Sequence, residues 1–412
     1  MRIFNLLLLT LVLTAITGIV KAQYLRGSAS TGVKLIPGLL RELKQPVSDI
    51  RKLELCIQLS SIYLFRPEEE KSHLDSAMVF ANQAKTLASS LHLSVKQQLA
   101  MTLIAGIYIE RPQRKMGLKL LKEINDNNIA EKDYLLASYY FGQFFLTGEK
   151  NSLFLDSCSR HYEKALFAYI KKGNADASKL VFREMYNIYQ DYGSAKDYSG
   201  QKSHFEKLIA LTTQYPYLMS QSEIYVSWTS SHVNLSNYKE ALAICLKGLA
   251  KAEKNGNERD RALLFLNLGN IYRLTGKPAQ SNSYYLKVLE SGVDISDVYR
   301  LYDIISVVCS NYIRTKQAGK AKDLLISYSA KHSNGSAAEK GTIHRAWGNV
   351  EAEMGNYEQA EKYLIDAGKY AKNAGSSQIA SNLWLAKLYL RQKKGAKALD
   401  ILKATESDAH KM

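Results

Sequence analysis

The sequence predicts an all-α fold: a solenoid of about nine antiparallel helical hairpins, each a pair of helices joined by a tight turn. In its second half, small residues recur every 38 to 40 positions, and another small residue follows each of them twelve positions later. A constant offset of this kind indicates two helices that approach closely at fixed points. None of the six prolines interrupts a predicted helix. The paired positions are Thr229 with Ala241, Gly269 with Ser281, Cys309 with Ala321, Gly348 with Ala360, and Ala386 with Ala398.

The composition is that of an ordinary folded protein. Hydrophobic residues make up 46% of the 412 residues and charged residues 23%, which argues against a disordered chain. Repeats override the usual expectation of two or three domains for this length, because a solenoid grows without enlarging one core. The net charge is +16, and Arg2 and Lys21 contribute two of those charges, leaving +14. This surplus favours acidic partners or anionic surfaces and does not by itself indicate nucleic acid.

Residues 1–22 are predicted to be a signal peptide. Arg2 gives a positive start, an apolar run extends from Leu6 to Val20, and Val20-Lys21-Ala22 is a small-x-small cleavage site. The alternative is an uncleaved membrane anchor, although the run is barely long enough to span a bilayer and contains threonines. Cleavage predicts export, to the periplasm if the source is bacterial. Residues 23–48 are expected to form a linker with a short helix at Leu39–Leu43.

Residues 49–216 have helical periodicity but a weak repeat signature, and they are expected to form four hairpins. The first hairpin begins near Ser48-Asp49, a suitable helix cap. Its loop carries Glu68-Glu69-Glu70, which we interpret as a solvated turn, because adjacent acids on a loop seldom converge on a cation. Turns are expected at Gly148 and Gly193 in the third and fourth hairpins. The helix pairs are Leu53–Leu64 with Leu74–Ser90, Val95–Ile109 with Arg114–Ile124, Glu131–Leu146 with Ser157–Lys171, and Asp176–Tyr192 with Gln201–Thr212.

Residues 217–406 carry the clearest repeats, above all the stretch from Ala337 to Gly375. Trp347-Gly348 lies on its first helix, Gly355-Asn356 forms the turn, and Ala360 lies on the second helix. This pattern resembles the tetratricopeptide repeat, which has a bulky residue and Gly on the first helix and small and aromatic residues on the second. The usual unit has about 34 residues, so the longer period implies helices about one turn longer. The resemblance implies a right-handed superhelix with a concave inner surface, followed by a tail at residues 407–412.

The sequence contains no motif for catalysis, cofactor binding or metal binding. It lacks His-Glu-x-x-His, Cys-x-x-Cys and Gly-x-Ser-x-Gly. The stretch from Gly269 to Lys277 faintly resembles a phosphate loop, but its glycines are wrongly spaced and Pro278 follows where Ser or Thr is needed. We therefore expect a non-catalytic chain with no cofactor or metal. The four cysteines are expected to be buried thiols, because even Cys245 and Cys309 fall two hairpins apart.

The resemblance also implies where a partner would bind. In tetratricopeptide proteins the first helix of each hairpin lines the inner groove, chiefly one residue after the Gly348-type position and one turn to either side. Arg345 with Asn349 resembles the Lys and Asn pair by which some family members hold a terminal carboxylate. Glu353 is an acidic exception, and a plain solvated face is the alternative interpretation. The predicted groove residues are Asn270, Arg273, Arg314, Arg345, Asn349, Lys387 and Arg391, together with Ser230 and Ser310.

Two functions of different classes fit these features. The first is an exported scaffold that binds a protein or an extended, acidic peptide in its groove. The second is a sensor region, because exported repeats with elements like Asp75-Ser76-Ala77 resemble the N-terminal halves of Bacteroidetes-type sensor histidine kinases. No kinase motif or membrane helix follows, so the second function requires that this chain is a fragment, and membrane contact requires that or an uncleaved signal segment. A nucleic-acid scaffold would use the positive charge but conflicts with export.

The last helix, Ala396 to about Glu406, has no polar capping helix after it. It is expected to expose apolar surface from Leu399, Ile401 and Leu402, which a partner or a further part of a longer chain would cover.

Overall fold

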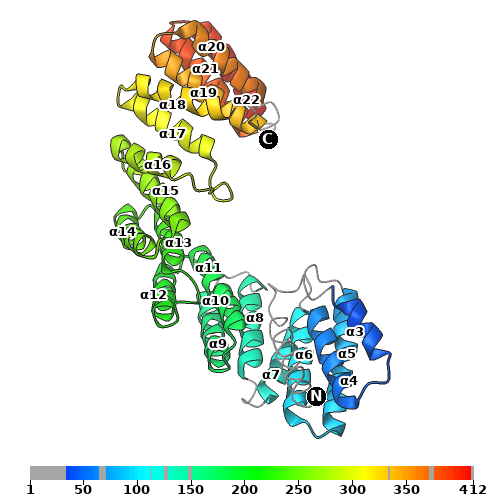
Figure 1. Ribbon diagram of the computed structural model, residues 1–412. Coiled ribbons are helices and arrows are strands. Elements are labelled where there is room, and N and C mark those ends of the chain that lie inside the picture. The colour runs from blue at the N-terminus through cyan, green and yellow to red at the C-terminus, as the bar shows by residue number, and fades with distance from the viewer. Residues whose placement is uncertain are drawn as a thin grey trace, which may run out of the picture. The chain divides into compact units, whose positions relative to one another are not determined.

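The computed structural model describes residues 34–64, 71–111, 113–124, 129–146, 151–332, 335–370 and 375–409. Within these ranges every regular element is an α-helix and no strand occurs, which confirms the predicted all-α class. The predicted signal segment 1–22, the Glu68–Glu70 loop and the Gly148 turn lie outside the described residues. The chain divides into two compact units, one ending at Ser220 and the other beginning at Gln221 (Figure 1).

In its described residues, the first unit contains a short helix followed by four hairpins. The short helix begins at Ile36, three residues before the predicted start, and Ile36 is buried against Leu59 and Ile62. The second helix of the third hairpin begins at Ser152 rather than Ser157. The helices are α3 (Ile36–Leu43), α4 (Asp49–Leu64), α5 (Lys71–Ser90), α6 (Ser94–Glu110), α7 (Arg114–Glu123), α8 (Ile129–Leu146), α9 (Ser152–Lys171), α10 (Ala175–Asn187), α11 (Tyr189–Ser194) and α12 (Tyr198–Gln214).

The fourth hairpin differs from its prediction. The sequence indicated one helix from Asp176 to Tyr192 that turns at Gly193, whereas Ile188 separates α10 from α11 and Gly193 lies inside α11. The turn falls at Lys196, whose φ of 58° is left-handed. Glycine is favoured in that conformation because it has no Cβ, so Gly193 was a misleading indication of where the chain reverses.

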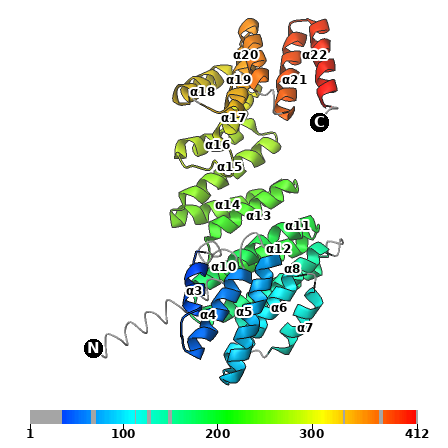
Figure 2. The same cartoon turned by 90° about the vertical axis from the view of Figure 1, so that its right-hand side faces the viewer.

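The second unit consists of five hairpins that follow one another in chain order (Figure 2). All ten residues of the predicted small-residue pairs are buried, which confirms the register of the repeats. The expected turn at Gly355 is left-handed, with φ of 85°. The helices are α13 (Gln221–Asn234), α14 (Tyr238–Asn255), α15 (Glu258–Leu274), α16 (Pro278–Ser291), α17 (Leu301–Arg314), α18 (Ala318–Lys331), α19 (Ala337–Glu353), α20 (Tyr357–Tyr370), α21 (Gly375–Arg391) and α22 (Gly395–Ala409).

Two glycines show why the small positions must be small. A Cβ added to Gly269 on α15 would lie 2.7 Å from ring carbons of Tyr285 on α16. A Cβ added to Gly348 on α19 would lie 2.6 Å from Cγ of Leu364 on α20. Real Cβ atoms hardly ever approach other heavy atoms so closely. The absent side chain is therefore what allows each pair of helices to pack at this distance.

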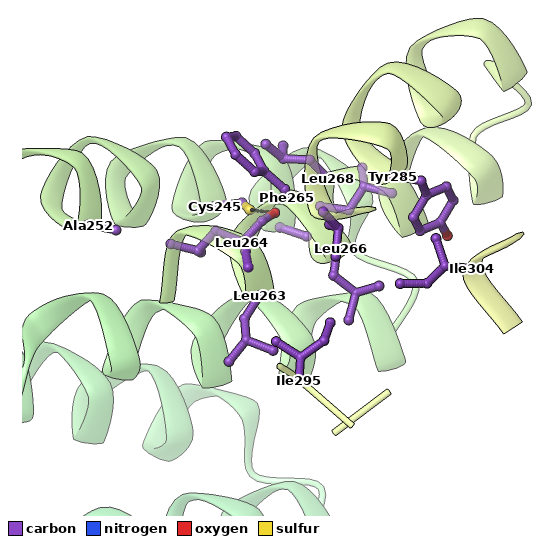
Figure 3. Close-up of a cluster of buried hydrophobic side chains, with 14 of the residues drawn as sticks. Cys245, Ala252, Leu263, Leu264, Phe265, Leu266, Leu268, Tyr285, Ile295 and Ile304 are labelled. Atoms are coloured by element: carbon purple, nitrogen blue, oxygen red, sulfur yellow. Dashed lines mark hydrogen bonds between the residues drawn. The ribbon is translucent and has the colours of Figure 1, made fainter. Parts of the chain in front are cut away.

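Buried side chains from α14, α15, α16 and α17 form one cluster in the second unit (Figure 3). Leu264, Leu268 and Tyr285 are fully buried within it, and the Cys245 thiol donates to the Leu264 carbonyl oxygen over 3.4 Å. All four cysteines are buried free thiols, as predicted. Burial raises the pKa of Cys245 and of Cys309 to about 12, so both behave as small apolar side chains rather than as nucleophiles.

A buried polar contact joins α16 to α17. Asn311 donates through Nδ2 to Asn282 Oδ1 over 2.8 Å and to Ser281 Oγ over 3.1 Å. Asn282 in turn donates through Nδ2 to the Val308 carbonyl oxygen over 3.2 Å. Both amides are buried, and leaving such groups unpaired would cost stability. These bonds therefore fix the register of one hairpin against the next.

The last helix, α22, exposes only part of the predicted apolar surface. Leu399 and Leu402 are exposed, but Ile401 packs against the buried cluster around Ala360 and Leu364. No helix in the described part of the chain is both long enough and apolar enough to cross a membrane.

Candidate functional site

The second unit carries a cavity of about 340 Å³ on the first helices of its last three hairpins. One face each of α17, α19 and α21 lines it, and Leu364 of α20 closes its base. These helices hold the cavity in shape because the small residues at Cys309, Gly348 and Ala386 fix their distances from their partners. The lining side chains are Ser310, Ile313, Arg314, Asn349, Ala352, Glu353, Leu364, Trp384, Lys387, Leu388 and Arg391.

The floor of this cavity is apolar. Leu364 and Leu388 are almost fully buried, with 2% exposure each, while Ile313 and Trp384 are half-buried. Apolar surface that is neither covered by the protein nor freely exposed is typical of a site that takes up a side chain of a ligand.

The rim is positively charged. Arg314, Lys387 and Arg391 line it together with a single acid, Glu353. Arg391 donates through Nη1 to Glu353 over 2.9 Å, so this pair is neutral as a whole. The Lys387 ammonium lies 4.5 Å from the centre of the Trp384 ring, a cation–π contact that leaves its charge uncompensated. Arg314 and Lys387 form no ion pair with any residue that the structure describes, and they give the rim a net positive charge.

Five of the predicted groove residues are brought together here. Arg314 and Ser310 come from α17, Asn349 from α19, and Lys387 and Arg391 from α21. Glu353, noted as the acidic exception, belongs to the same site and balances Arg391.

Arg345 does not share this cavity with Asn349, as the predicted carboxylate pair would require. It is half-buried one turn earlier on α19, where its Nη2 lies 3.4 Å from Thr342 Oγ1. Burial lowers the pKa of the Arg345 guanidinium, and the nearby Asp303 carboxylate partly offsets that effect. Because one helical turn is about 5.4 Å, Arg345 lies too far along α19 from Asn349 to line the same cavity.

Asn270 and Arg273 lie on α15, outside the cavity. Asn270 Oδ1 accepts a hydrogen bond of 2.7 Å from the Tyr285 hydroxyl. Burial raises the pKa of Tyr285 to about 12, and its interaction with Arg273 offsets part of the rise. Both side chains are therefore engaged in packing α15 against α16. Ser230, on α13, also lies outside the cavity, and its hydroxyl donates to the Val226 carbonyl oxygen of the same helix over 3.0 Å.

The apolar half of the site was not predicted from the sequence. Trp384 lies one turn before Lys387 on the same helix face, so a tryptophan beside a predicted groove lysine was the available signal. Ile313, Leu364 and Leu388 gave none, because their apolar character is equally expected of the core.

No metal-binding cluster occurs among the described residues. None of their His, Cys, Asp and Glu side chains gather in a group of three or more that could hold a metal ion. The cavity can bind by charge, hydrogen bonding and apolar contact, and its lining offers no nucleophile paired with a base.

No protein-family model matches the chain, and no curated protein matches its sequence. Among solved structures, a tetratricopeptide repeat protein from Parabacteroides merdae is 12% identical, with 61% of this chain and 79% of that one covered and a TM-score of 0.40. The apo form of the quorum sensor NprR from B. thuringiensis is 13% identical, with 82% and 97% covered and a TM-score of 0.45. YrrB, a tetratricopeptide protein with an unusual peptide-binding site, is 15% identical, with 50% and 91% covered and a TM-score of 0.34.

These similarities concern the helical-repeat fold alone. The fold of this chain is tetratricopeptide-like on its own geometry: antiparallel hairpins in sequence, close contacts at Gly269 and Gly348, and a buried alanine or serine twelve residues after each.

Proposed function

We propose that this chain is a binding scaffold for a protein partner, which presents an extended segment to the cavity on α17, α19 and α21. One observation carries the proposal: an apolar floor lies beneath two cations, Arg314 and Lys387, that have no acidic partner within the described structure. A face that serves only solvation needs charged residues but gains nothing from an apolar hollow between them. The combination favours a ligand that brings both an anionic group and an apolar one.

The segment that fits has a carboxylate next to an apolar side chain. The planar guanidinium of Arg314 can donate two parallel hydrogen bonds to a carboxylate, and Lys387 adds a second positive charge nearby. The apolar side chain would enter the cavity over Trp384 and Leu388. A carboxylate at this rim also competes with Glu353 for Arg391, which gives the site a third donor once the ligand is in place. An acidic stretch and a free chain end both supply this chemistry.

Fluorescence anisotropy with labelled peptides tests the proposal. The probe is an eight-residue acidic peptide with a central leucine, and the control peptide has lysine in place of each acid. Arg314→Ala and Lys387→Ala should each weaken binding of the acidic peptide about tenfold, because a hydrogen bond between charged groups contributes about 1.5–3 kcal/mol. Lys251→Ala, which removes an exposed lysine from α14, is the matched control and should leave affinity unchanged.

Salt provides a second measure, since exposed charges are screened within about 8 Å at physiological ionic strength. Affinity should therefore fall as salt rises. The proposal is wrong if the double variant of Arg314 and Lys387 binds the acidic peptide with full affinity, or if the lysine peptide binds equally well. Melting curves establish that each variant is folded, and we expect little change in melting temperature because both side chains are exposed.

We propose further that the chain is exported and that cleavage follows Ala22. The support is the sequence of residues 1–22, with its positive start, apolar run and small-x-small site. Mass spectrometry of the chain isolated from its source should find Gln23 as the first residue. Recovery of a chain that begins at Met1 would contradict cleavage.

A further inference from the structure

A second cavity, of about 490 Å³, lies between α18, α19 and α20 of the second unit. It is separate from the cavity that we propose for peptide binding, because the two occupy opposite faces of α19. Ile343 lines one cavity and Ala352 the other, and nine residues along an α-helix amount to two and a half turns. The two cavities therefore have no wall in common on this helix.

Aromatic rings dominate its lining. Trp347 of α19 stacks on Tyr363 of α20, with ring centres 5.6 Å apart and planes inclined by 14°. Tyr328 of α18 stacks on His332, with centres 4.3 Å apart. Tyr370, near the end of α20, is 40% exposed and also lines the cavity. One tryptophan and three tyrosines from three helices, together with His332, thus line this hollow.

His344 completes this aromatic lining from α19. Its ring makes edge-on contacts with Tyr363, at 5.5 Å between centres, and with Tyr370, at 5.1 Å. Burial lowers the pKa of His344, so the ring is neutral near pH 7 and adds no positive charge to the cavity. Its Nδ1 is buried and has no hydrogen-bond partner among the described residues, which leaves polar capacity unused at this wall.

A carboxylate lies among these rings. Glu339 of α19 has only 16% of its side chain exposed, and it accepts a hydrogen bond of 2.6 Å from the Tyr328 hydroxyl. The one basic nitrogen within 4 Å of it, in the part of the chain that the structure describes, is His332 Nδ1 at 3.8 Å. Carboxylates so far removed from water are normally paired with a cation. This one has a tyrosine and a distant imidazole instead.

We infer that the aromatic cavity is a binding site for an organic ammonium group, formed by Trp347, Tyr328, Tyr363 and Tyr370 around the Glu339 carboxylate. Aromatic faces attract cations through their quadrupole, and quaternary ammonium groups suit such sites because they are large and weakly hydrated. Glu339 supplies the full negative charge that completes the attraction. Lys340, the next residue, also lines the cavity and opposes a cationic ligand.

The adjacent charges Glu339 and Lys340 make the inference easy to test, because they should act with opposite sign. Calorimetry of the whole protein with choline is the first measurement, and 3,3-dimethylbutanol, which has the same shape without the charge, is the neutral control. We expect choline to bind and the alcohol to bind about tenfold more weakly or worse. Glu339→Gln should weaken choline binding about tenfold, whereas Lys340→Gln should strengthen it.

Glu358→Gln is the matched control for charge, since Glu358 is an exposed acid on α20 that does not line the cavity. Its affinity for choline should equal that of the unaltered protein. The amides of Nα-acetyl-lysine and Nα-acetyl-trimethyllysine keep a positively charged side chain. Tested in the same way, they distinguish a site for small ammonium compounds from one for a partner's side chain, and binding by either source supports the inference. Melting curves establish that each variant is folded.

Three results would overturn the inference. One is the absence of saturable binding by every ammonium probe at millimolar concentration. Another is equal affinity for choline and for its neutral counterpart, which would mean an apolar pocket without charge selectivity. The third is a folded Glu339→Gln protein that binds choline as tightly as before.

Discussion

A single methyl group on α19 tests the packing of the second unit. Gly348→Ala adds a Cβ that would lie 2.6 Å from Leu364 Cγ and 3.3 Å from the Ala360 carbonyl oxygen. Gly368→Ala, on the neighbouring α20, adds the same atom where nothing lies within 4 Å. Both changes gain the higher helix propensity of alanine, about 1 kcal/mol. Only the first also overpacks a helix contact, which costs about 1–3 kcal/mol.

The propensity gain is common to both variants, so the difference between them isolates the cost of the contact. We expect Gly368→Ala to be up to about 1 kcal/mol more stable than the unaltered protein, and Gly348→Ala to be about 1–3 kcal/mol less stable than Gly368→Ala. Urea unfolding followed by tryptophan fluorescence suits the measurement, because all three tryptophans, at positions 228, 347 and 384, belong to the second unit. Equal stability of the two alanine variants would refute the close approach of α19 and α20.

Further predictions concern both units. Ala360→Leu should lower the free energy of unfolding by about 1–3 kcal/mol in the same assay, because Ala360 is fully buried against α19. Trp347→Ala should cost about 2 kcal/mol, less than the 3–5 kcal/mol of a fully buried ring, since Trp347 is only half-buried. Cys245 and Cys309 should resist iodoacetamide at pH 8 until urea is added, because a pKa of about 12 leaves almost no thiolate; rapid labelling of the folded chain would contradict this. Burial lowers the pKa of His204 to about 4 in the folded chain. Below about pH 6.5 the His204 imidazole therefore binds a proton in the unfolded chain but stays neutral in the folded chain until the pH approaches 4. Stability of the first unit should fall by about 3 kcal/mol between pH 6.5 and 4, and the fall should be smaller in His204→Gln when hydrogen exchange of α12 is compared at both pH values.

Helix pairing in the second unit could be predicted because helices in close contact need small residues at regular positions, and these can be recognised in the sequence. Gly348 faces Leu364 at a distance that no side chain tolerates, and similar contacts recur at a fixed spacing. The fourth hairpin of the first unit has no such pattern of small residues. Lys196 adopts a left-handed conformation that its side chain disfavours, so no local preference marks the turn. The hairpin is held by packing, and packing between distant segments is not visible in a short stretch.

The candidate site could be predicted in part, for a related reason. The repeat register predicts which helix face lines a groove, and three residues assigned to that face, Arg314, Asn349 and Lys387, line one cavity. The repeat register does not predict how far two helices are offset along their axes. For this reason the prediction included Arg345, which lies about one turn away from the cavity.

The aromatic cavity was not predictable in this way at all. Tyr328, Trp347 and Tyr363 come from three helices, and each looks like an ordinary packing residue within its own helix. Only their convergence around Glu339 distinguishes them, and convergence is a property of the folded chain.

The amides that join α16 to α17 limit how this chain can be cut or recombined. Asn282 and Asn311 lie on opposite sides of the connection at residues 292–300. One hydrogen bond joins the two side chains directly, and each side chain also bonds to one further group across the connection. A fragment that stops at Ser291 would keep Asn282 but expose it without its hydrogen-bond partners. A chimera with a different hairpin in place of α17 and α18 would need an amide at the position of Asn311. Despite the common period of the repeats, the hairpin that ends with α16 and the hairpin that begins with α17 are matched to each other by specific side chains, so neither can be exchanged freely for another repeat.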